Sequence, residues 1–329
     1  MKAIIYTEYG SPDVLQYAEV AKPTPKDDEV LLETRAASVN PLDWRLMKGV
    51  PHVFRILFRL PRPSATQPGR PGRDVAGRVE AVGRNVTQFK PGDEVFGWCS
   101  GALAEYACAA ESALVVKPDN VTFEQAASIP VAGLTALQGL RDKGSLQPGQ
   151  KVLINGAAGG VGTFAVQIAR SLDAEVTGVC STRNVDMVRS LGAARVFDYT
   201  HKDFTRSGQR YDLILDNVGN HSLSACRRVL NPNGICVIAG APKEPGIFLT
   251  RALTAPVLSL FVRQKFGMFI AKLRKGDLTV MCELMGAGKV SSVIDRRYRL
   301  SEAREAIRYL EEGHARGKVV ITMEDRAEA

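Results

Sequence analysis

The chain contains 329 residues, of which 45% are hydrophobic and 24% are charged. This length favours two domains over a single core, and the composition is that of a globular protein rather than a disordered one. The formal net charge is +8, but no dense basic run with interleaved aromatic residues accompanies it, so we do not expect nucleic-acid binding.

The sequence up to about residue 117 is punctuated by proline and glycine. Short runs that favour β-strands, at residues 29–36, 77–82 and 94–98, are separated by turns rich in these two residues. Residues 57–72 contain several prolines and are expected to form a loop. The pattern predicts an irregular, β-rich, barrel-like unit.

Beyond residue 118 the pattern changes to alternating strands and helices. Helices are expected to begin near Thr122 and to span residues 134–141, 161–172 and 184–191. Alternation of strands and helices predicts βαβ crossovers and a doubly wound parallel sheet. The strands expected in that sheet are residues 151–155, 175–180, 195–198, 211–216 and 234–239.

Residues 247–270 form an apolar stretch. Arg251, Pro256 and Arg263 interrupt it and leave pieces too short to span a bilayer. We expect helices packed at a domain or subunit interface; a lid over a substrate pocket and a contact with a membrane surface are the alternatives. The remaining predicted elements are a strand at 290–294, a helix at 301–312 capped by Ser301, and a last strand at 318–322.

The cysteines and the N-terminus indicate a reducing compartment. The six cysteines are scattered and form no C-x-x-C pair, which argues against disulfides and against a cysteine zinc cluster. The first eight residues contain no long apolar run before Glu8, so we expect no secretory signal peptide. The expected location is the cytoplasm.

The strongest functional motif is a glycine-rich turn between the predicted strand 151–155 and the helix 161–172. Such a turn directs backbone N–H groups and a helix N-terminus at a pyrophosphate, and a Cβ atom there would block close approach. The strand–turn–helix context predicts a dinucleotide site rather than a plain structural turn. The residues expected to contact the cofactor are Gly156, Ala158, Gly159, Gly160, Val161 and Gly162.

The tip of the next predicted strand selects between NADH and NADPH. An acid about twenty residues after the glycine turn would bind the ribose 2′-hydroxyl of NADH, whereas this sequence has Ser181 and Arg183 there. A hydroxyl and a guanidinium bind a 2′-phosphate through charge-assisted hydrogen bonds. The sequence therefore predicts NADPH, with Tyr199 closing the phosphate or adenine side; a solvated loop with an ordinary arginine is the alternative.

Several motifs occur in a fixed order along nearly the whole chain. They are residues 39–44 (VNPLDW), 71–77 (PGRDVAG), 91–97 (PGDEVFG), 132–136 (AGLTA), the glycine turn and residues 313–318 (GHARGK). Together they resemble the quinone oxidoreductase (zeta-crystallin-like) branch of the medium-chain dehydrogenase/reductase superfamily. Within that branch the chain is most similar to the chloroplast-envelope type and to related NADPH-dependent enone reductases.

The resemblance implies an α/β protein with two domains and an active site in the cleft between them. The two chain ends, residues 1–118 and 263–329, would form a GroES-like β-rich catalytic domain around a Rossmann domain, residues 119–262. The resemblance also implies a homodimer. It assigns further cofactor contacts to Thr135, Asn217, Ala239, Gly240 and Lys318.

One departure from the zinc alcohol dehydrogenases of this superfamily concerns the metal. The positions that match their catalytic zinc ligands hold Asn40, Arg73 with Asp74, and about Val131, and the four-cysteine structural lobe is missing. Asn, Arg and Val make no tetrahedral zinc site, so we expect no metal.

An activated acceptor is the expected substrate in the absence of a Lewis acid. We expect NADPH to deliver hydride to a quinone ring or to the β-carbon of an α,β-unsaturated carbonyl, with hydrogen-bond donors stabilising the resulting phenolate or enolate. Asn40 is the catalytic candidate because it can donate, or else it caps the following turn; Asp43 is expected to be a local cap or ion-pair partner. We expect four aromatic residues either to line an apolar pocket for the acceptor or to belong to the core: Trp44, Phe54, Phe96 and Trp98.

Three other functions stay open from the sequence alone. They are a zinc-independent alcohol or ketone reductase, a non-catalytic NADPH-binding protein, and a protein with weak membrane association through residues 247–270.

Overall fold

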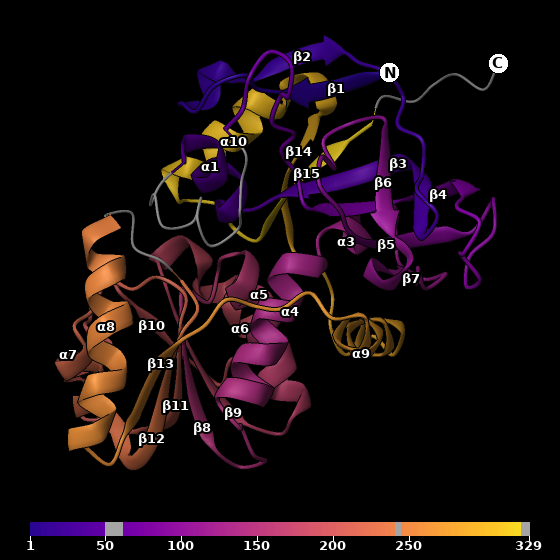
Figure 1. Cartoon of the computed structure of the whole chain (residues 1–329). Helices are drawn as coiled ribbons and strands as arrows, with labels where there is room; N and C mark the ends of the chain where they lie inside the picture. The colour runs from indigo at the N-terminus through magenta and orange to yellow at the C-terminus, as the bar shows by residue number, and fades with distance from the viewer. Residues whose placement is uncertain (50–61, 241–244, 324–329) are drawn as a thin grey trace. The chain divides into compact units, whose positions relative to one another are not determined.

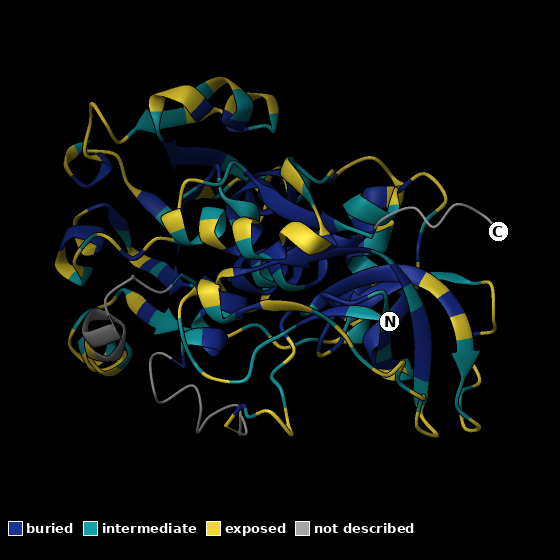
Figure 2. Cartoon of the chain, turned by 90° about the horizontal axis from the view of Figure 1, so that it is seen from above, coloured by how far each residue is buried: buried dark blue, intermediate teal, exposed yellow. Residues whose placement is uncertain are grey.

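A computed structural model describes residues 1–49, 62–240 and 245–323 of the chain. The chain divides into two compact units, the first being Met1–Val131, Leu273–Ala287 and Ser292–Ala329, and the second Ala132–Lys272 and Gly288–Ser291. Each unit has its own large β-sheet (Figure 1). The strands are mostly buried, and exposed residues gather in loops and on helix surfaces (Figure 2).

The first unit is built on a seven-stranded sheet that joins the two ends of the chain. The strands are β3 (Glu29–Val39), β4 (Asp74–Val82), β5 (Glu94–Trp98), β6 (Tyr106–Ala110), β7 (Leu114–Val116), β14 (Ile294–Arg299) and β15 (Lys318–Thr322). Their order is β14-β15-β3-β4-β5-β7, and β6 pairs with β3. Because β15 lies antiparallel to β3, with Val319 opposite Val39, residues from both chain ends complete one sheet, as the family resemblance implies.

Smaller elements surround this sheet. Strands β1 (Lys2–Ile5) and β2 (Gln16–Glu19) form a separate antiparallel pair. The helices of the unit are α1 (Pro41–Lys48), α3 (Phe123–Ala127), α9 (Lys275–Gly286) and α10 (Ala303–Glu312). Apolar side chains of the strands, among them Val30, Leu32 and Val319, are fully buried in its core.

The second unit is a doubly wound parallel sheet, as the alternation of strands and helices predicts. Its strands are β8 (Lys151–Asn155), β9 (Glu175–Cys180), β10 (Arg195–Asp198), β11 (Tyr211–Asp216), β12 (Leu230–Ile238) and β13 (Lys265–Met268). All neighbours are parallel, in the order β10-β9-β8-β11-β12-β13. The order reverses between β8 and β11, and ligands of such sheets bind at the carboxyl ends of the strands at this reversal.

Helices cover both faces of the parallel sheet. They are α4 (Pro130–Gln138, whose first two residues belong to the first unit), α5 (Gly160–Ser171), α6 (Val185–Ser190), α7 (Leu223–Arg228) and α8 (Pro245–Phe261). Figure 1 shows α8 on one side of the sheet and α4 on the other. Within the described residues, no helix is long and apolar enough to cross a membrane.

The apolar stretch 247–270 differs from its prediction. Helix α8 continues through Arg251 and Pro256, and the chain then adds the short edge strand β13, which the sequence analysis missed. Arg251 does not interrupt the helix because its guanidinium is buried and lies 3.3 Å from the Asp216 carboxylate. The outward-facing side chains Leu253, Val257, Leu260 and Phe261 are exposed.

Two predictions for the C-terminal part of the chain were wrong. Residues 290–293 form no strand, because Ser291 donates its backbone N–H (2.9 Å) to the Gln167 side chain on α5. Ser301 is not the cap of the last helix. The Glu302 carboxylate accepts the backbone N–H of Arg299 at 2.8 Å, so a 3-10 turn forms first and α10 begins at Ala303.

Candidate functional site

The glycine-rich turn lies at the reversal of the parallel sheet. Strand β8 ends at Asn155, and Gly156 follows with a φ of +78°, a backbone angle that residues other than glycine rarely adopt. The backbone N–H groups of Gly156 and Ala157 donate to the Val179 carbonyl on β9, at 3.2 and 3.0 Å. The turn is therefore anchored to the neighbouring strand and delivers the chain directly into α5.

Two glycines of the turn have different reasons to be glycine. A Cβ atom on Gly162 would lie 2.1 Å from the Gly156 carbonyl oxygen, so this glycine permits the packing of α5 against the turn. A Cβ atom on Gly159 would have only the Gly156 oxygen near it, at 3.5 Å, so the space beside Gly159 is open to a ligand. Helix α5 begins there, and its first N–H groups have no intrahelical acceptor, which suits a pyrophosphate.

The residues predicted to hold a 2′-phosphate lie at the ends of two adjacent strands. Ser181 and Arg183 follow β9, and Tyr199 follows β10. The Tyr199 N–H donates to the Cys180 carbonyl at 3.0 Å, which brings the two tips together. Tyr199 is 56% exposed, so a ligand in solvent can reach it.

An acid that the sequence analysis did not consider also lies near these tips. Asp198 ends β10, directly opposite Cys180 in the strand register. Its pKa is lowered, first by a hydrogen bond from the Thr182 side chain, and the Thr200 hydroxyl donates to it at 2.7 Å. These threonine hydroxyls bind the carboxylate within the loop.

Asn217 directly follows β11, and its side-chain amide lacks hydrogen-bond partners within the part of the chain that the structure describes. Its backbone N–H donates to the Asn155 carbonyl at 3.1 Å, so it lies beside the glycine turn. Its side-chain nitrogen and oxygen are buried and have no partner among the described residues. Since buried polar groups are almost always hydrogen-bonded, the residues present fit a dinucleotide with hydroxyl and amide groups.

Ala239 and Gly240, after β12, lie against the same point. Their N–H groups donate to the Asp216 carbonyl at 3.0 and 3.1 Å, and a Cβ atom on Gly240 would lie 1.9 Å from the Asn217 carbonyl oxygen. The structure thus brings Asn217, Ala239 and Gly240 together at the carboxyl ends of β11 and β12. Thr135 is half-buried on α4.

A buried network that sequence reasoning missed holds these strand ends in place. The Asp216 carboxylate accepts from the Asn155 amide (2.8 Å), from the Gly219 N–H (2.8 Å) and from Arg251 on α8 (3.3 Å). The sequence did contain a signal for this network: Arg251 lies in an apolar helix and Asp216 ends an apolar strand. A buried charge of either kind needs a partner.

In the first unit, Asn40 and Lys318 meet in a second polar cluster. The Lys318 Nζ lies 2.6 Å from Asn40 Oδ1 and 3.3 Å from Asp74 Oδ2, and the Asn40 Nδ2 donates to the same Asp74 oxygen at 2.8 Å. All three side chains are buried, with residue exposures of 3% for Asn40, 0% for Asp74 and 3% for Lys318. Asn40 occupies the N-cap position of α1, but its amide points to Asp74 and Lys318 instead of capping the helix.

Asp43 is a local cap, as the sequence analysis expects. Its carboxylate accepts the Asn40 backbone N–H at 2.7 Å. Burial raises its pKa from 3.8 to about 6, and the nearby Asp74 charge adds to the rise, whereas the Asn40 hydrogen bond, Arg73 and Lys318 oppose it.

The aromatic candidates for an acceptor pocket are distributed unequally. Trp44 belongs to the hydrophobic core of the unit and Phe96 is completely buried, which favours the core alternative for both. Trp98 is half-buried and lies opposite Asp74 in the strand register, so it adjoins the polar cluster. Phe54 lies outside the described residues.

Known proteins share this architecture along the whole chain. Family models for the alcohol dehydrogenase GroES-like domain and for a zinc-binding dehydrogenase match residues 26–119 and 191–321. A chloroplast envelope quinone oxidoreductase homolog of Arabidopsis thaliana is 37% identical over 336 residues and covers 98% of both chains. The chain belongs to the quinone oxidoreductase branch of the medium-chain dehydrogenase/reductase superfamily.

Two further matches represent this branch. An NADPH-dependent alkenal/one oxidoreductase of Arabidopsis thaliana, a chloroplastic protein, is 32% identical and covers 98% of this chain and 79% of its own. The structure of the quinone oxidoreductase from Coxiella burnetii has a TM-score of 0.86 at 30% identity, and covers 98% of this chain and 99% of the other.

One matching family is described as a zinc-binding dehydrogenase, but the side chains of Asn40 and Asp74, at two of the positions that match catalytic zinc ligands, do not fit a zinc ion. The Lys318 ammonium group lies between the Asn40 and Asp74 side chains. Its positive charge would repel a zinc ion at this position. In the part of the chain that the structure describes, no three His, Cys, Asp or Glu side chains form a group that could hold a metal ion. All six cysteines are free.

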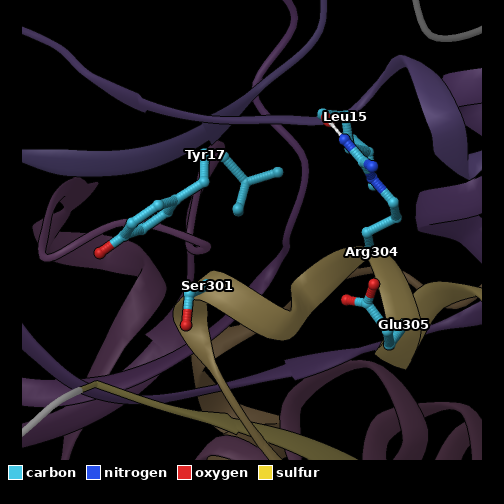
Figure 3. Close-up of a pocket in the computed structure, with 6 residues that line it drawn as sticks. Leu15, Tyr17, Ser301, Arg304 and Glu305 are labelled. Atoms are coloured by element: carbon cyan, nitrogen blue, oxygen red, sulfur yellow. Dashed lines mark hydrogen bonds between the residues drawn. The ribbon is translucent and has the colours of Figure 1, made fainter.

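A small pocket of about 200 Å³ lies elsewhere in the first unit (Figure 3). Its lining includes Tyr17, Arg304 and Glu305, and none of the predicted site residues. Arg304 already donates to the Leu15 carbonyl at 2.6 Å, so its charge is partly engaged. Figure 3 shows this guanidinium directed at Leu15 rather than into the space between Tyr17 and Ser301.

Replacing the two glycines tests the cofactor site. Gly159→Ala is expected to change the free energy of unfolding by less than about 1 kcal/mol but to raise the Kd for NADPH at least about tenfold, because its Cβ fills the open space. Gly162→Ala is expected to cost roughly 1–3 kcal/mol through overpacking. Denaturant unfolding and fluorescence titration with NADPH measure both; unchanged affinity in Gly159→Ala would contradict the site.

Asp43 predicts a pH dependence of stability. Because its pKa is raised on folding from 3.8 to about 6, the folded state binds the proton more tightly, and stability is lost as pH rises from about 4 to above 6. Relative to Asp43→Asn, the wild-type protein should therefore lose about 2–3 kcal/mol between these limits. Urea unfolding of both proteins at several pH values measures the difference; a difference independent of pH would show that the carboxyl has an ordinary pKa.

Proposed function

We propose that this chain is an NADPH-dependent oxidoreductase that transfers a hydride to a quinone or to an α,β-unsaturated carbonyl compound. The observation that carries the proposal is the buried Asn217 amide, without a partner among the described residues, beside the glycine turn at the reversal of the sheet. The names of its relatives support both acceptor classes: two are quinone oxidoreductases and one is an NADPH-dependent alkenal/one oxidoreductase.

The chain's own residues would hold the cofactor as follows. Backbone N–H groups of the glycine turn bind the pyrophosphate, and Ser181, Arg183 and Tyr199 bind the 2′-phosphate. Asn217 fixes the ribose and nicotinamide end, and bound NADPH supplies the hydride. Contacts from Thr135, Ala239 and Gly240 belong to the same proposal. Lys318 would act on Asn40 rather than on the cofactor, because its ammonium group lies 2.6 Å from the Asn40 oxygen.

The acceptor would be activated by hydrogen bonding. As hydride reaches the β-carbon of an enone or the ring of a quinone, negative charge develops on the carbonyl oxygen. The Asn40 amide donates to that oxygen, and its buried surroundings strengthen the interaction because water does not compete there. Trp98 would offer an apolar wall for the acceptor.

A panel of acceptors tests the reaction. NADPH oxidation should be rapid with benzoquinone, with methyl vinyl ketone or with a long-chain vinyl ketone, and absent with saturated ketones. Reduction of NADP by simple alcohols would instead favour an alcohol or ketone reductase. Tight NADPH binding without turnover of any acceptor would favour a non-catalytic NADPH-binding protein.

The preference for NADPH over NADH is tested at Arg183. Loss of charge-assisted hydrogen bonds in Arg183→Ala should cost about 1.5–3 kcal/mol, or roughly 10- to 100-fold in the Kd for NADPH, with little change for NADH. Arg206→Ala is a matched control, since this arginine is exposed and lies 3.7 Å from Asp203 in another loop. Equal weakening of both dinucleotides in Arg183→Ala would contradict the assignment.

Several features stay predictions. They are the domain bounds at residues 118 and 262, a homodimer, weak membrane association and a cytoplasmic location. The exposed apolar residues Leu253, Val257, Leu260 and Phe261 of α8 support an interface role for that helix. The free cysteines are compatible with a reducing compartment.

A further inference from the structure

We propose that Asp74 and Lys318 form a buried charge pair whose role is to position the Asn40 amide as a hydrogen-bond donor to the acceptor. The inference rests on the proposed function and deepens it, because it gives Asp74 a role and makes Lys318 a positioning residue for Asn40. The pair lies within the first unit, on strands β4 and β15, and Asn40 directly follows β3.

The two charges determine which way the amide points. The Lys318 ammonium group can only donate, and it lies 2.6 Å from the Asn40 oxygen. The ionised Asp74 carboxylate can only accept, and it lies 2.8 Å from the Asn40 nitrogen. A flipped amide would set its N–H groups against the ammonium and its oxygen against the carboxylate, so only one orientation is stable.

In this orientation one donor of Asn40 is left over. The amide nitrogen has two hydrogens, and the structure gives this nitrogen one acceptor among the described residues, Asp74. The cation bound to the amide oxygen withdraws electron density and makes the remaining N–H a stronger donor. A donor held in one direction before the substrate arrives is what stabilisation of a developing oxyanion requires.

The Asp74 carboxylate can hold this cluster together because it accepts from several hydrogen-bond donors that surround it. Its Oδ2 atom accepts from the Ser38 hydroxyl at 2.7 Å as well as from Asn40 and Lys318, and its Oδ1 atom accepts the Val131 N–H at 3.0 Å. An asparagine at this position would turn an N–H₂ group toward one of these donors. Asp74→Asn is therefore expected to disturb the amide of Asn40 even though it preserves the size of the side chain.

Lys318→Met and Lys318→Gln in the full chain test the positioning role. Methionine removes both the charge and the donor, whereas glutamine keeps an N–H that can reach the Asn40 oxygen. The kcat is measured with the fastest acceptor of the panel and saturating NADPH. Lys318→Met should lower it about 100-fold, and Lys318→Gln should lower it only about tenfold. The Kd for NADPH should stay within about threefold of the wild-type value in both.

Lys117→Met is the matched control for the loss of a buried lysine. Lys117 is 7% exposed and holds a loop of the same unit, donating to the Val121 carbonyl at 2.8 Å and lying 3.0 Å from Glu94. Its replacement should lower stability and leave kcat unchanged. A similar fall in kcat in Lys117→Met and Lys318→Met would mean that Lys318 acts only through stability.

Two other kinetic results would overturn the proposal. If Lys318→Gln is as slow as Lys318→Met, the positive charge itself acts on the acceptor. If either variant raises the Kd for NADPH while kcat at saturation is unchanged, Lys318 serves the cofactor instead.

A spectroscopic measurement tests the orientation without any turnover. In protein labelled with nitrogen-15 at asparagine, the side-chain signals of Asn40 are identified by their loss in Asn40→Ala. These signals should shift and exchange faster with water in Lys318→Met and stay in place in Lys117→Met; unchanged signals in Lys318→Met would overturn the proposal. Because no acceptor is needed, this result is independent of whether the proposed reaction takes place.

Discussion

The antiparallel ladder between β3 and β15 is the constraint on which the polar cluster depends. Val39 lies opposite Val319, so Asn40, which directly follows β3, and Lys318, the first residue of β15, are brought together from positions 278 residues apart. Strand β4, on the other side of β3, brings Asp74 to the same place. Breaking such a buried pair by removing one partner typically costs about 3–5 kcal/mol, so the ladder and the ion pair stabilise one another.

Much of the second unit could be predicted from the sequence. Strands β8, β9, β10 and β11 have the predicted bounds, because each is a short run with turn residues on both sides and parallel strands are apolar along their length. The edge strand β13 could not be predicted, since four residues in register with β12 alone carry little local signal. Helix α10 begins later than predicted because a 3-10 turn forms first, in which the Glu302 carboxylate accepts the Arg299 backbone N–H.

The candidate site shows the same division between local and long-range information. The glycine turn was predictable because its motif is contiguous in sequence, and Asn217 was assigned through the family resemblance. The partners of Asp216 and Asp74 were not, because Arg251 and Lys318 lie 35 and 244 residues away. A buried charge signals in the sequence that a partner exists, but only the fold says which residue it is.

The chain order of the two units has a consequence for biosynthesis. Residues 132–272, which make up most of the second unit, are contiguous, so this unit can fold while the ribosome is still adding the rest. The first unit has to wait for β15, and until Lys318 emerges the nascent protein carries Asp74 without its cation. A ribosome that stalls shortly before this strand would therefore leave a folded dinucleotide-binding half attached to an open sheet edge, the kind of species that chaperones and proteases recognise.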